Sequence, residues 1–175
     1  RFWCGRWLTT VRARQRLAQE RRLFASHSEG ENPICLIYPN RYPVGMANLG
    51  FKAAYRILSQ DPRCCCERAF LPDLDEAEAL SRATAPLASL ESQRRLPEFE
   101  LLAFSLSFET DYLHILDILA AAHIPLLARD REDHHVACLR EVGRHGRRRE
   151  HRREAARFGS CADTACPART SFDDS

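Results

Sequence analysis

The sequence predicts an incomplete doubly wound α/β fold, with a mostly parallel sheet, an N-terminal helix and a basic C-terminal tail. Short apolar runs with the character of buried strands alternate with amphipathic stretches of about a dozen residues. This alternation favours right-handed crossovers, in which helices cover both faces of a parallel sheet. The length of 175 residues and the apolar fraction of 45% fit a single globular domain.

The first part of the chain predicts a helix, a strand and a second helix. A helix is expected over 8–26, where apolar residues recur among arginines, and a linker follows. The run 34–38 is continuously apolar, which is typical of a strand buried on both faces. A loop over 39–48 follows, and Asn48 can cap a helix that stops before Pro62. The expected inward stripe of that helix is Leu49, Ala53, Ile57 and Leu58.

The alternation continues with two more strands and two more helices. A strand is expected over 64–71, after which Asp73 caps a helix with an acidic first turn. An irregular excursion leads to a third strand over 101–105, a helix over 111–122 and the start of a fourth strand over 124–127. The expected inward stripes of the two helices are Leu74, Ala77 and Leu80, and then Leu113, Leu116 and Leu119.

Charge is distributed unevenly and divides the chain into three parts. Residues 1–31 carry seven basic and three acidic side chains, residues 32–128 carry eight and twelve, and residues 129–175 carry eleven and nine. We expect an N-terminal helix and linker, an α/β domain, and an Arg-rich tail that is disordered or weakly helical. A shift of reading frame near 129–136 is an alternative explanation of the tail's composition.

The eight cysteines are expected to be reduced, because a core-forming chain of this length needs no disulfide scaffold. Cys64, Cys65 and Cys66 alternate in direction along a strand and are expected to be small buried hydrophobic residues. We expect no metal ligands, since His134, His135 and Cys138 lack the paired spacing of a zinc site. No apolar run approaches the roughly 18 residues of a membrane span, and we expect a cytoplasmic protein.

A ligand site is expected where the strands end. In doubly wound sheets the ligand lies outside the carboxyl ends of the strands, which here points to the loops 39–48 and 105–110. Glu109 and Asp111 lie at this edge, but they have no visible nucleophile partner, and we assign no catalytic residue.

Four ordered motifs resemble one known family. They are Tyr38–Phe51, Cys66–Phe70 with the following Pro72-Asp73, Pro86–Ser92, and Phe104–Glu109. This pattern resembles the N-terminal domain of radical S-adenosylmethionine (radical SAM) proteins that carry a cobalamin-binding-like domain ahead of an iron–sulfur barrel. The resemblance covers roughly residues 32–128 and implies a flavodoxin-like, cobalamin-binding-like fold.

The resemblance also implies a cofactor-binding surface. Its expected residues are Asn40, Arg41, Tyr42, Gly45, Met46 and Asn48 in the first loop, and Ser105, Ser107 and Glu109 in the second. Arg41 would pair with a phosphate or carboxylate. Relatives hold a [4Fe-4S] cluster through a CxxxCxxC motif, use S-adenosylmethionine, and in some cases bind cobalamin. The chain contains no CxxxCxxC, and the first loop has no histidine to ligate cobalt.

We therefore expect an N-terminal domain of a radical SAM protein, truncated or frame-disrupted before the barrel and without radical chemistry of its own. Its expected partner is the missing barrel or another protein surface, because a sheet without its last crossover leaves an apolar face uncovered. Two alternatives remain open at this point. The chain could be a stand-alone protein-interaction module, or a basic nucleic-acid binder acting through its arginine-rich tail.

Overall fold

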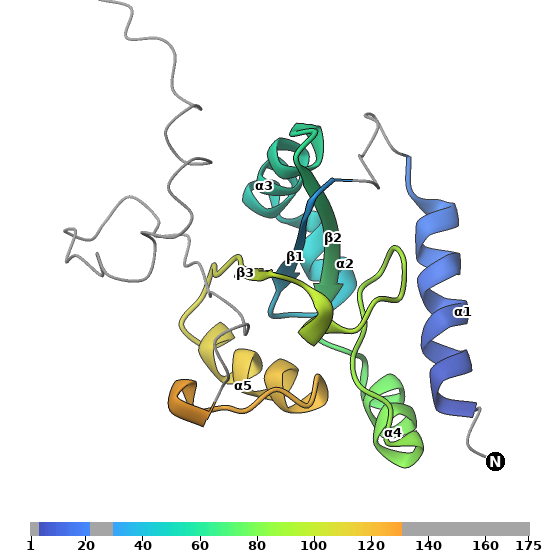
Figure 1. The fold of residues 1–175 in the computed structure, drawn as a ribbon. Helices are drawn as coiled ribbons and strands as arrows, with labels where there is room; N and C mark the ends of the chain where they lie inside the picture. The colour runs from blue at the N-terminus through green and yellow to red at the C-terminus, as the bar shows by residue number, and fades with distance from the viewer. Residues whose placement is uncertain (1–3, 22–29, 131–175) are drawn as a thin grey trace, which may run out of the picture. The chain divides into compact units, whose positions relative to one another are not determined.

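A central sheet of three parallel strands organises the fold in the computed structural model, which describes residues 4–21 and 30–130. The strands are β1 (Asn32–Tyr38), β2 (Cys64–Phe70) and β3 (Leu101–Phe104). Their order is β2-β1-β3, so the chain moves to one side of β1 for its second strand and to the other side for its third (Figure 1). The predicted incomplete α/β fold with a parallel sheet is confirmed.

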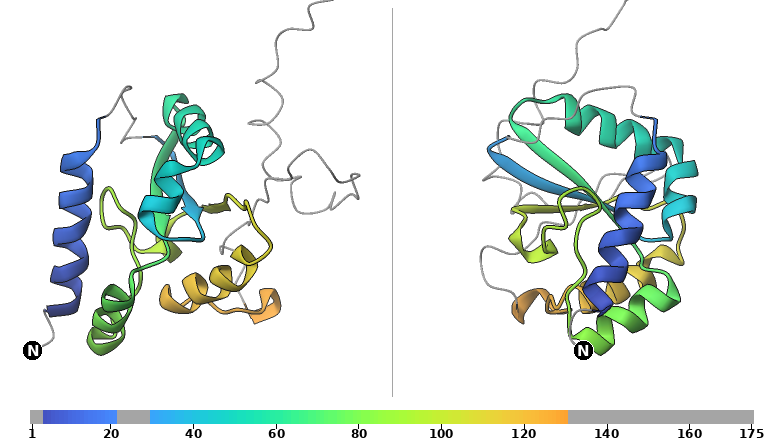
Figure 2. Two further views of the ribbon diagram at one scale, coloured as in Figure 1. Left: turned by 180° about the vertical axis from the view of Figure 1, so that it is seen from behind. Right: turned by 90° about the vertical axis from the view of Figure 1, so that its right-hand side faces the viewer.

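Helices connect and cover the strands (Figure 2). They are α1 (Cys4–Gln19), α2 (Tyr42–Ala47), α3 (Leu49–Gln60), α4 (Leu74–Ala83) and α5 (Asp111–Ala121), with short 3₁₀ helices at Leu96–Glu98 and Ala128–Asp130. Helices α2 and α3 join β1 to β2, and α3 packs against β2. Helix α1 packs mainly against α4. The loop expected over 39–48 is therefore wrong in part, because its second half forms α2.

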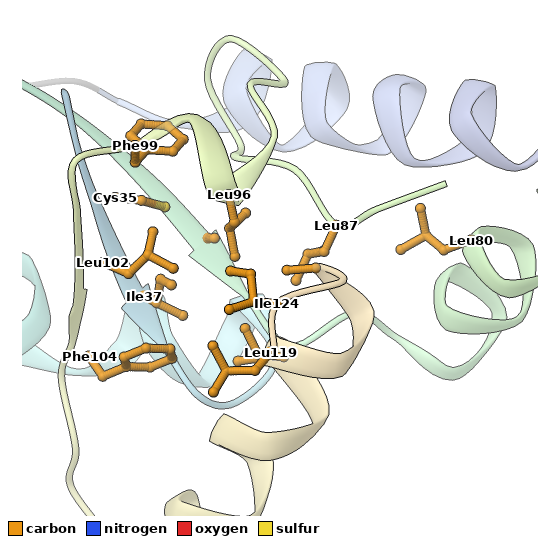
Figure 3. Close-up of a cluster of buried hydrophobic side chains, with 13 residues drawn as sticks. Cys35, Ile37, Leu80, Leu87, Leu96, Phe99, Leu102, Phe104, Leu119 and Ile124 are labelled. Carbon is orange, nitrogen blue, oxygen red and sulfur yellow. The ribbon is translucent and has the colours of Figure 1, made fainter. Parts of the chain in front are cut away.

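The sheet has a hydrophobic core on each face, because alternate residues of each strand point in opposite directions. On one face, Cys35 and Ile37 of β1 and Phe104 of β3 meet Leu119 of α5, together with Leu96 from the excursion (Figure 3). The opposite core is built from the remaining strand positions and α3, with a contribution from α1. Its main members are Ile34, Leu36, Tyr38, Phe51, Tyr55, Cys66, Phe70 and Ala13.

The helix expected over 8–26 is wrong in its bounds, because α1 begins at Cys4 and ends at Gln19. The predicted starts at Asn48 and Asp73 are confirmed. Asn48 caps α3, since its side-chain oxygen accepts a hydrogen bond from the Phe51 N–H at 2.9 Å. At α4, the Glu76 carboxylate accepts from the Asp73 N–H at 2.9 Å, which is half of a reciprocal capping box. These local bonds satisfy backbone donors that the helices themselves leave free.

The predicted inward stripes of α3 and α4 are wrong in phase. Helix α3 buries Phe51, Tyr55 and Ser59, whereas Leu49 and Ile57 are exposed. Helix α4 buries Leu80 as expected, but Leu74 is exposed and Glu76 is buried. Phe51 and Tyr55 of α3 pack in the core against the sheet, and the predicted stripe therefore faces largely outward.

Helix α5 presents a different side to the core from the one expected. Leu119 is buried as predicted, together with Asp111 and Ile118, but Leu113 and Leu116 are exposed. These two leucines form a second apolar stripe on the far side of the helix, which is why periodicity alone chose the wrong side. An apolar stripe on both sides is typical of a helix that is covered twice.

The fourth strand expected over 124–127 is wrong. The Ile124 N–H donates to the Leu119 carbonyl at 2.9 Å, so this residue closes the end of α5 instead of entering the sheet. His123 before it has a positive φ of 59°, and Pro125 after it has no N–H to give to a strand ladder. Ile124 is buried in the core, whereas Leu126 and Leu127 are exposed.

The two edges of the sheet differ. Along β2, the Leu90 N–H donates to the Arg68 carbonyl at 2.6 Å, and the Arg68 N–H donates to Glu91 at 2.7 Å. The excursion therefore covers this edge. Along β3, no strand pairs with the outer edge within the described residues.

The cysteines of β2 are buried, as predicted. No helix in the described ranges is long and apolar enough to cross a membrane.

Candidate ligand site

The two predicted loops meet at the carboxyl ends of β1 and β3. The Asn48 side-chain nitrogen donates to the Ser107 hydroxyl oxygen at 2.9 Å, across 59 positions of sequence. Asn48 also caps α3, so its amide is oriented from both ends. In the order β2-β1-β3, the gap between β1 and β3 is the point where the connections diverge, and ligands of doubly wound folds bind there.

Asp111, the first residue of α5, supports the second loop from beneath. One carboxylate oxygen, Oδ2, accepts the Ser107 N–H at 3.0 Å and the Phe108 N–H at 2.9 Å. The other oxygen, Oδ1, is buried, and no group in the described ranges donates a hydrogen bond to it. The side chain as a whole is 0% exposed. Asp111 thus fixes the Ser107 backbone and keeps one acceptor unused.

His114 joins α5 to the end of β1. Its ring nitrogen Nδ1 lies 2.9 Å from the Pro39 carbonyl oxygen. A carbonyl can only accept, so Nδ1 carries the proton and a neutral ring has its acceptor at Nε2. Together with the bond between Asn48 and Ser107, this contact connects both sides of the gap.

Arg41 is already paired. Its guanidinium donates to Asp73 Oδ1 at 2.7 Å, and the same carboxylate accepts from Arg16 of α1 at 3.0 Å. The Asn40 side chain turns back and accepts the Arg41 N–H at 2.8 Å. These contacts direct the cation of the first loop toward α4 rather than toward the gap.

Three other predicted residues face the protein interior. Tyr42 packs edge-on against Phe70, with ring centroids 5.2 Å apart, and its hydroxyl donates to Glu20 at 2.7 Å. Burial, reinforced by Glu20, raises the pKa of Tyr42 to about 12. A Cβ on Gly45 would lie 2.6 Å from the Phe70 ring, so glycine is required for this close approach. The Met46 sulfur contacts the Arg68 guanidinium at 3.3 Å.

The remaining two predicted residues lie at the end of β3. Ser105 is buried, and its N–H donates to the Ile37 carbonyl at 2.9 Å. Glu109 is exposed beside the first turn of α5. Of the nine predicted residues, the structure therefore brings Asn48 and Ser107 into direct contact.

A buried charged cluster centred on Arg68 was missed by the sequence analysis. Its guanidinium is 1% exposed and pairs with Glu91 at 2.7 Å and with Glu20 at 2.8 Å. It also lies over the Tyr55 ring, 4.5 Å from the centroid. Burial opposes the charge, but the two carboxylates outweigh it and raise the pKa of Arg68. The sequence did contain a signal for this cluster, because Glu67 and Arg68 interrupt the apolar residues of the predicted strand.

The described residues do not fit an iron–sulfur cluster. Such a cluster needs several thiolates at one point, and no group of three His, Cys, Asp or Glu side chains in the described ranges could hold a metal ion. Burial raises the pKa of the Cys35 and Cys66 thiols, which opposes the thiolate form that binds metals. A cavity of about 50 Å³ among α1, α4 and the end of β2 has room for solvent rather than a cofactor.

The fold and the meeting of the two loops define an α/β domain of the doubly wound class with a candidate site at its switch point. A family model described as radical SAM proteins, N-terminal, matches residues 50–140, just over half of the chain. The chain therefore belongs to this radical SAM family and contains its N-terminal region. The match includes Ser107 and Asp111 but begins after the loop 39–48. No curated protein and no solved structure matches the chain.

Proposed function

We propose that this chain is a cobalamin-binding-like N-terminal domain of a radical SAM protein that holds a cofactor or substrate at the gap between β1 and β3. The observation that carries the proposal is the hydrogen bond between Asn48 and Ser107, which joins the two loops at the switch point. The family match supports it, because radical SAM chemistry requires a substrate or second cofactor to be presented to the cluster.

The proposed domain extends over residues 32–128, between an N-terminal helix with its linker and the arginine-rich tail. In this proposal the [4Fe-4S] cluster and S-adenosylmethionine are held by the barrel domain of the family, and the described residues contribute no radical chemistry of their own. The cysteines of the sheet support this division of labour, since they are buried. A cytoplasmic location stays a prediction.

The stripe of α5 that faces away from the sheet supports a protein partner. Leu113 and Leu116 are 67% and 45% exposed, and Leu126 and Leu127 after the helix are about half exposed. Exposed apolar residues of this kind are typical of a surface that another protein part covers. We propose that the barrel, or another protein surface, packs here. The alternative of a stand-alone interaction module would use the same stripe, and the nucleic-acid alternative concerns a tail outside the described residues.

Equilibrium dialysis of the full chain against hydroxocobalamin tests the cofactor proposal. We expect retention of the corrin absorbance, and weaker retention in the variant Ser107→Ala, which removes the acceptor of the Asn48 amide. The matched control is Ser81→Ala, because Ser81 is exposed on α4 and far from the site in sequence. Absence of retention, or equal retention by both variants, would overturn cobalamin binding at this gap.

A further inference from the structure

The unused acceptor of Asp111 indicates what kind of group the site receives. Resting on the proposed function, we infer that the gap between β1 and β3 recognises a hydrogen-bond-donating nitrogen group, an amide or an ammonium, through Asp111 Oδ1. The phosphate or carboxylate expected from the sequence does not fit these residues. The inference follows from three properties of the site: an acceptor without a partner, a cation that is already paired, and engaged donors next to Asp111.

The orphan acceptor is the strongest of the three. Asp111 is 0% exposed, and its Oδ1 has no donor within the described residues, although Oδ2 accepts two backbone N–H groups. A buried polar atom without a partner costs roughly 1 to 3 kcal/mol, so such atoms are uncommon in folded proteins. Because Oδ2 binds the N–H groups of Ser107 and Phe108, the Asp111 carboxylate lies against the loop that contacts Asn48. A ligand with an N–H group would satisfy it.

The charge of the one cation in these loops is already compensated by a carboxylate. Arg41 is the only arginine or lysine within 39–48 and 105–110, and its guanidinium is bound to Asp73 at 2.7 Å. Glu109 adds a carboxylate at the entrance to α5. A phosphate here would meet two carboxylates and one cation that is already paired, which is unfavourable, whereas an ammonium would be attracted.

The donors nearest to Asp111 and Asn48 are already engaged within the protein. The Asn48 amide nitrogen donates to Ser107 at 2.9 Å, and the backbone N–H groups of Ser107 and Phe108 donate to Asp111. His114 uses its Nδ1 proton for the Pro39 carbonyl, and its other nitrogen is an acceptor in the neutral ring. Asp111 Oδ1 and the second ring nitrogen of His114 are therefore left as acceptors for a ligand.

The substitution Asp111→Asn tests the inference with almost no change of shape. The asparagine oxygen can take the place of Oδ2 and keep both backbone N–H bonds, while its NH₂ replaces Oδ1. The site then presents a donor where it presented an acceptor. The matched control is Asp117→Asn, which removes the same charge from an exposed position of the same helix.

Thermal shift and dialysis of the full chain would use four probes. Hydroxocobalamin, which carries primary amides, and spermidine, an amine, are the donor probes; inorganic phosphate and pyrophosphate are the anionic ones. We expect at least one donor probe to bind, with affinity lowered about tenfold in Asp111→Asn and unchanged in Asp117→Asn. Binding of the amide but not the amine, or the reverse, identifies the source of the nitrogen group.

Two outcomes would overturn the inference, and they differ in what they mean for the proposed function. If the anions bind, and if Asp111→Asn strengthens them or leaves them unchanged, the site is real but its ligand class is wrong. If no probe binds the native chain, the inference and the proposed function fail together.

A second variant covers the case in which Asp111→Asn does not fold. Asn48→Asp keeps the α3 cap, because its carboxylate can still accept the Phe51 N–H, and it adds an acceptor beside Ser107. It should tighten the donor probe. Weaker binding of that probe would contradict the inference.

Discussion

Arg68 and Glu91 form an ion pair inside the protein, with Arg68 Nε 2.7 Å from Glu91 Oε1 and the arginine side chain 1% exposed. Glu91 binds the Arg68 backbone N–H as well, so one carboxylate holds both the side chain and the strand edge. Glu20, just after α1, pairs with the other side of the guanidinium. The cluster thus connects β2, the excursion and the N-terminal helix.

Removing the carboxylate of this pair should be strongly destabilising. We expect Glu91→Gln to lower the free energy of unfolding by about 3 kcal/mol or more. The buried Arg68 guanidinium would then have only one carboxylate, that of Glu20, to balance its charge. Urea unfolding followed by circular dichroism measures the change. Glu98→Gln serves as the control, since its carboxylate lies in the 3₁₀ helix outside this cluster. Equal midpoints for the two variants would show that the cluster is not buried in solution.

The docking of α1 should respond to acid through Asp75. The Arg12 guanidinium holds the pKa of Asp75 at about 2, below its usual value near 4. Because the pKa of Asp75 is lower in the folded state than in the unfolded state, its pairing with Arg12 stabilises the fold at a pH above about 4. This stabilisation is lost as the pH falls from about 4 to about 2. We expect the melting temperatures of the native chain and of Asp75→Asn to converge over this interval. Parallel curves would contradict the pairing.

The same docking should weaken in salt. Arg12 and Arg16 contact Asp73, Asp75 and Glu76 at the start of α4, and several of these side chains are partly exposed. Exposed ion pairs are screened at high ionic strength. We expect 1 M NaCl to increase proteolysis before β1 in the native chain, with a smaller increase in Arg16→Met, which already lacks part of the contact. A cleavage pattern insensitive to salt would argue for apolar docking.

The cysteines of the sheet should react slowly with thiol reagents. Burial raises the pKa of Cys35 and Cys66, and thiols react as thiolates. We expect the native chain to release fewer equivalents of chromophore with an aromatic disulfide reagent at pH 8 than the urea-unfolded chain. The variant Cys35→Ser should release as much chromophore in the first, rapid phase of the reaction as the native chain, because Cys35 is buried. Loss of rapid signal in that variant would place Cys35 at the surface.

The two sides of α5 should differ in their contribution to stability. Leu119 lies in the core at 2% exposure, and its replacement by alanine should cost about 2 to 5 kcal/mol. Leu113 is 67% exposed, and Leu113→Ala should stay within about 0.5 kcal/mol of the native chain. Urea midpoints of the two variants compare them directly. If the two variants lost similar amounts of unfolding free energy, Leu113 would be buried in solution, as the sequence predicted.

Local signals in the sequence predicted most of the elements. Apolar runs, interrupted by two charged residues in β2, located the three strands. The caps at Asn48 and Asp73 located the starts of α3 and α4. These predictions succeeded because strand burial and helix capping depend on residues close together in the chain. The two loops of the candidate site followed from the general position of ligands in such sheets.

Only the tertiary structure decided which partner each side chain has. Periodicity could not tell which stripe of α5 faces the sheet, because Leu113 and Leu116 are as apolar as the residues that are buried. Arg41 and its partner Asp73 are 32 positions apart in the sequence, and Arg68 and its partner Glu20 are 48 positions apart. The sequence by itself therefore determined the strands, the caps and the family, since these follow from local order. The ligand side of the site depends on contacts that exist only after distant segments pack together.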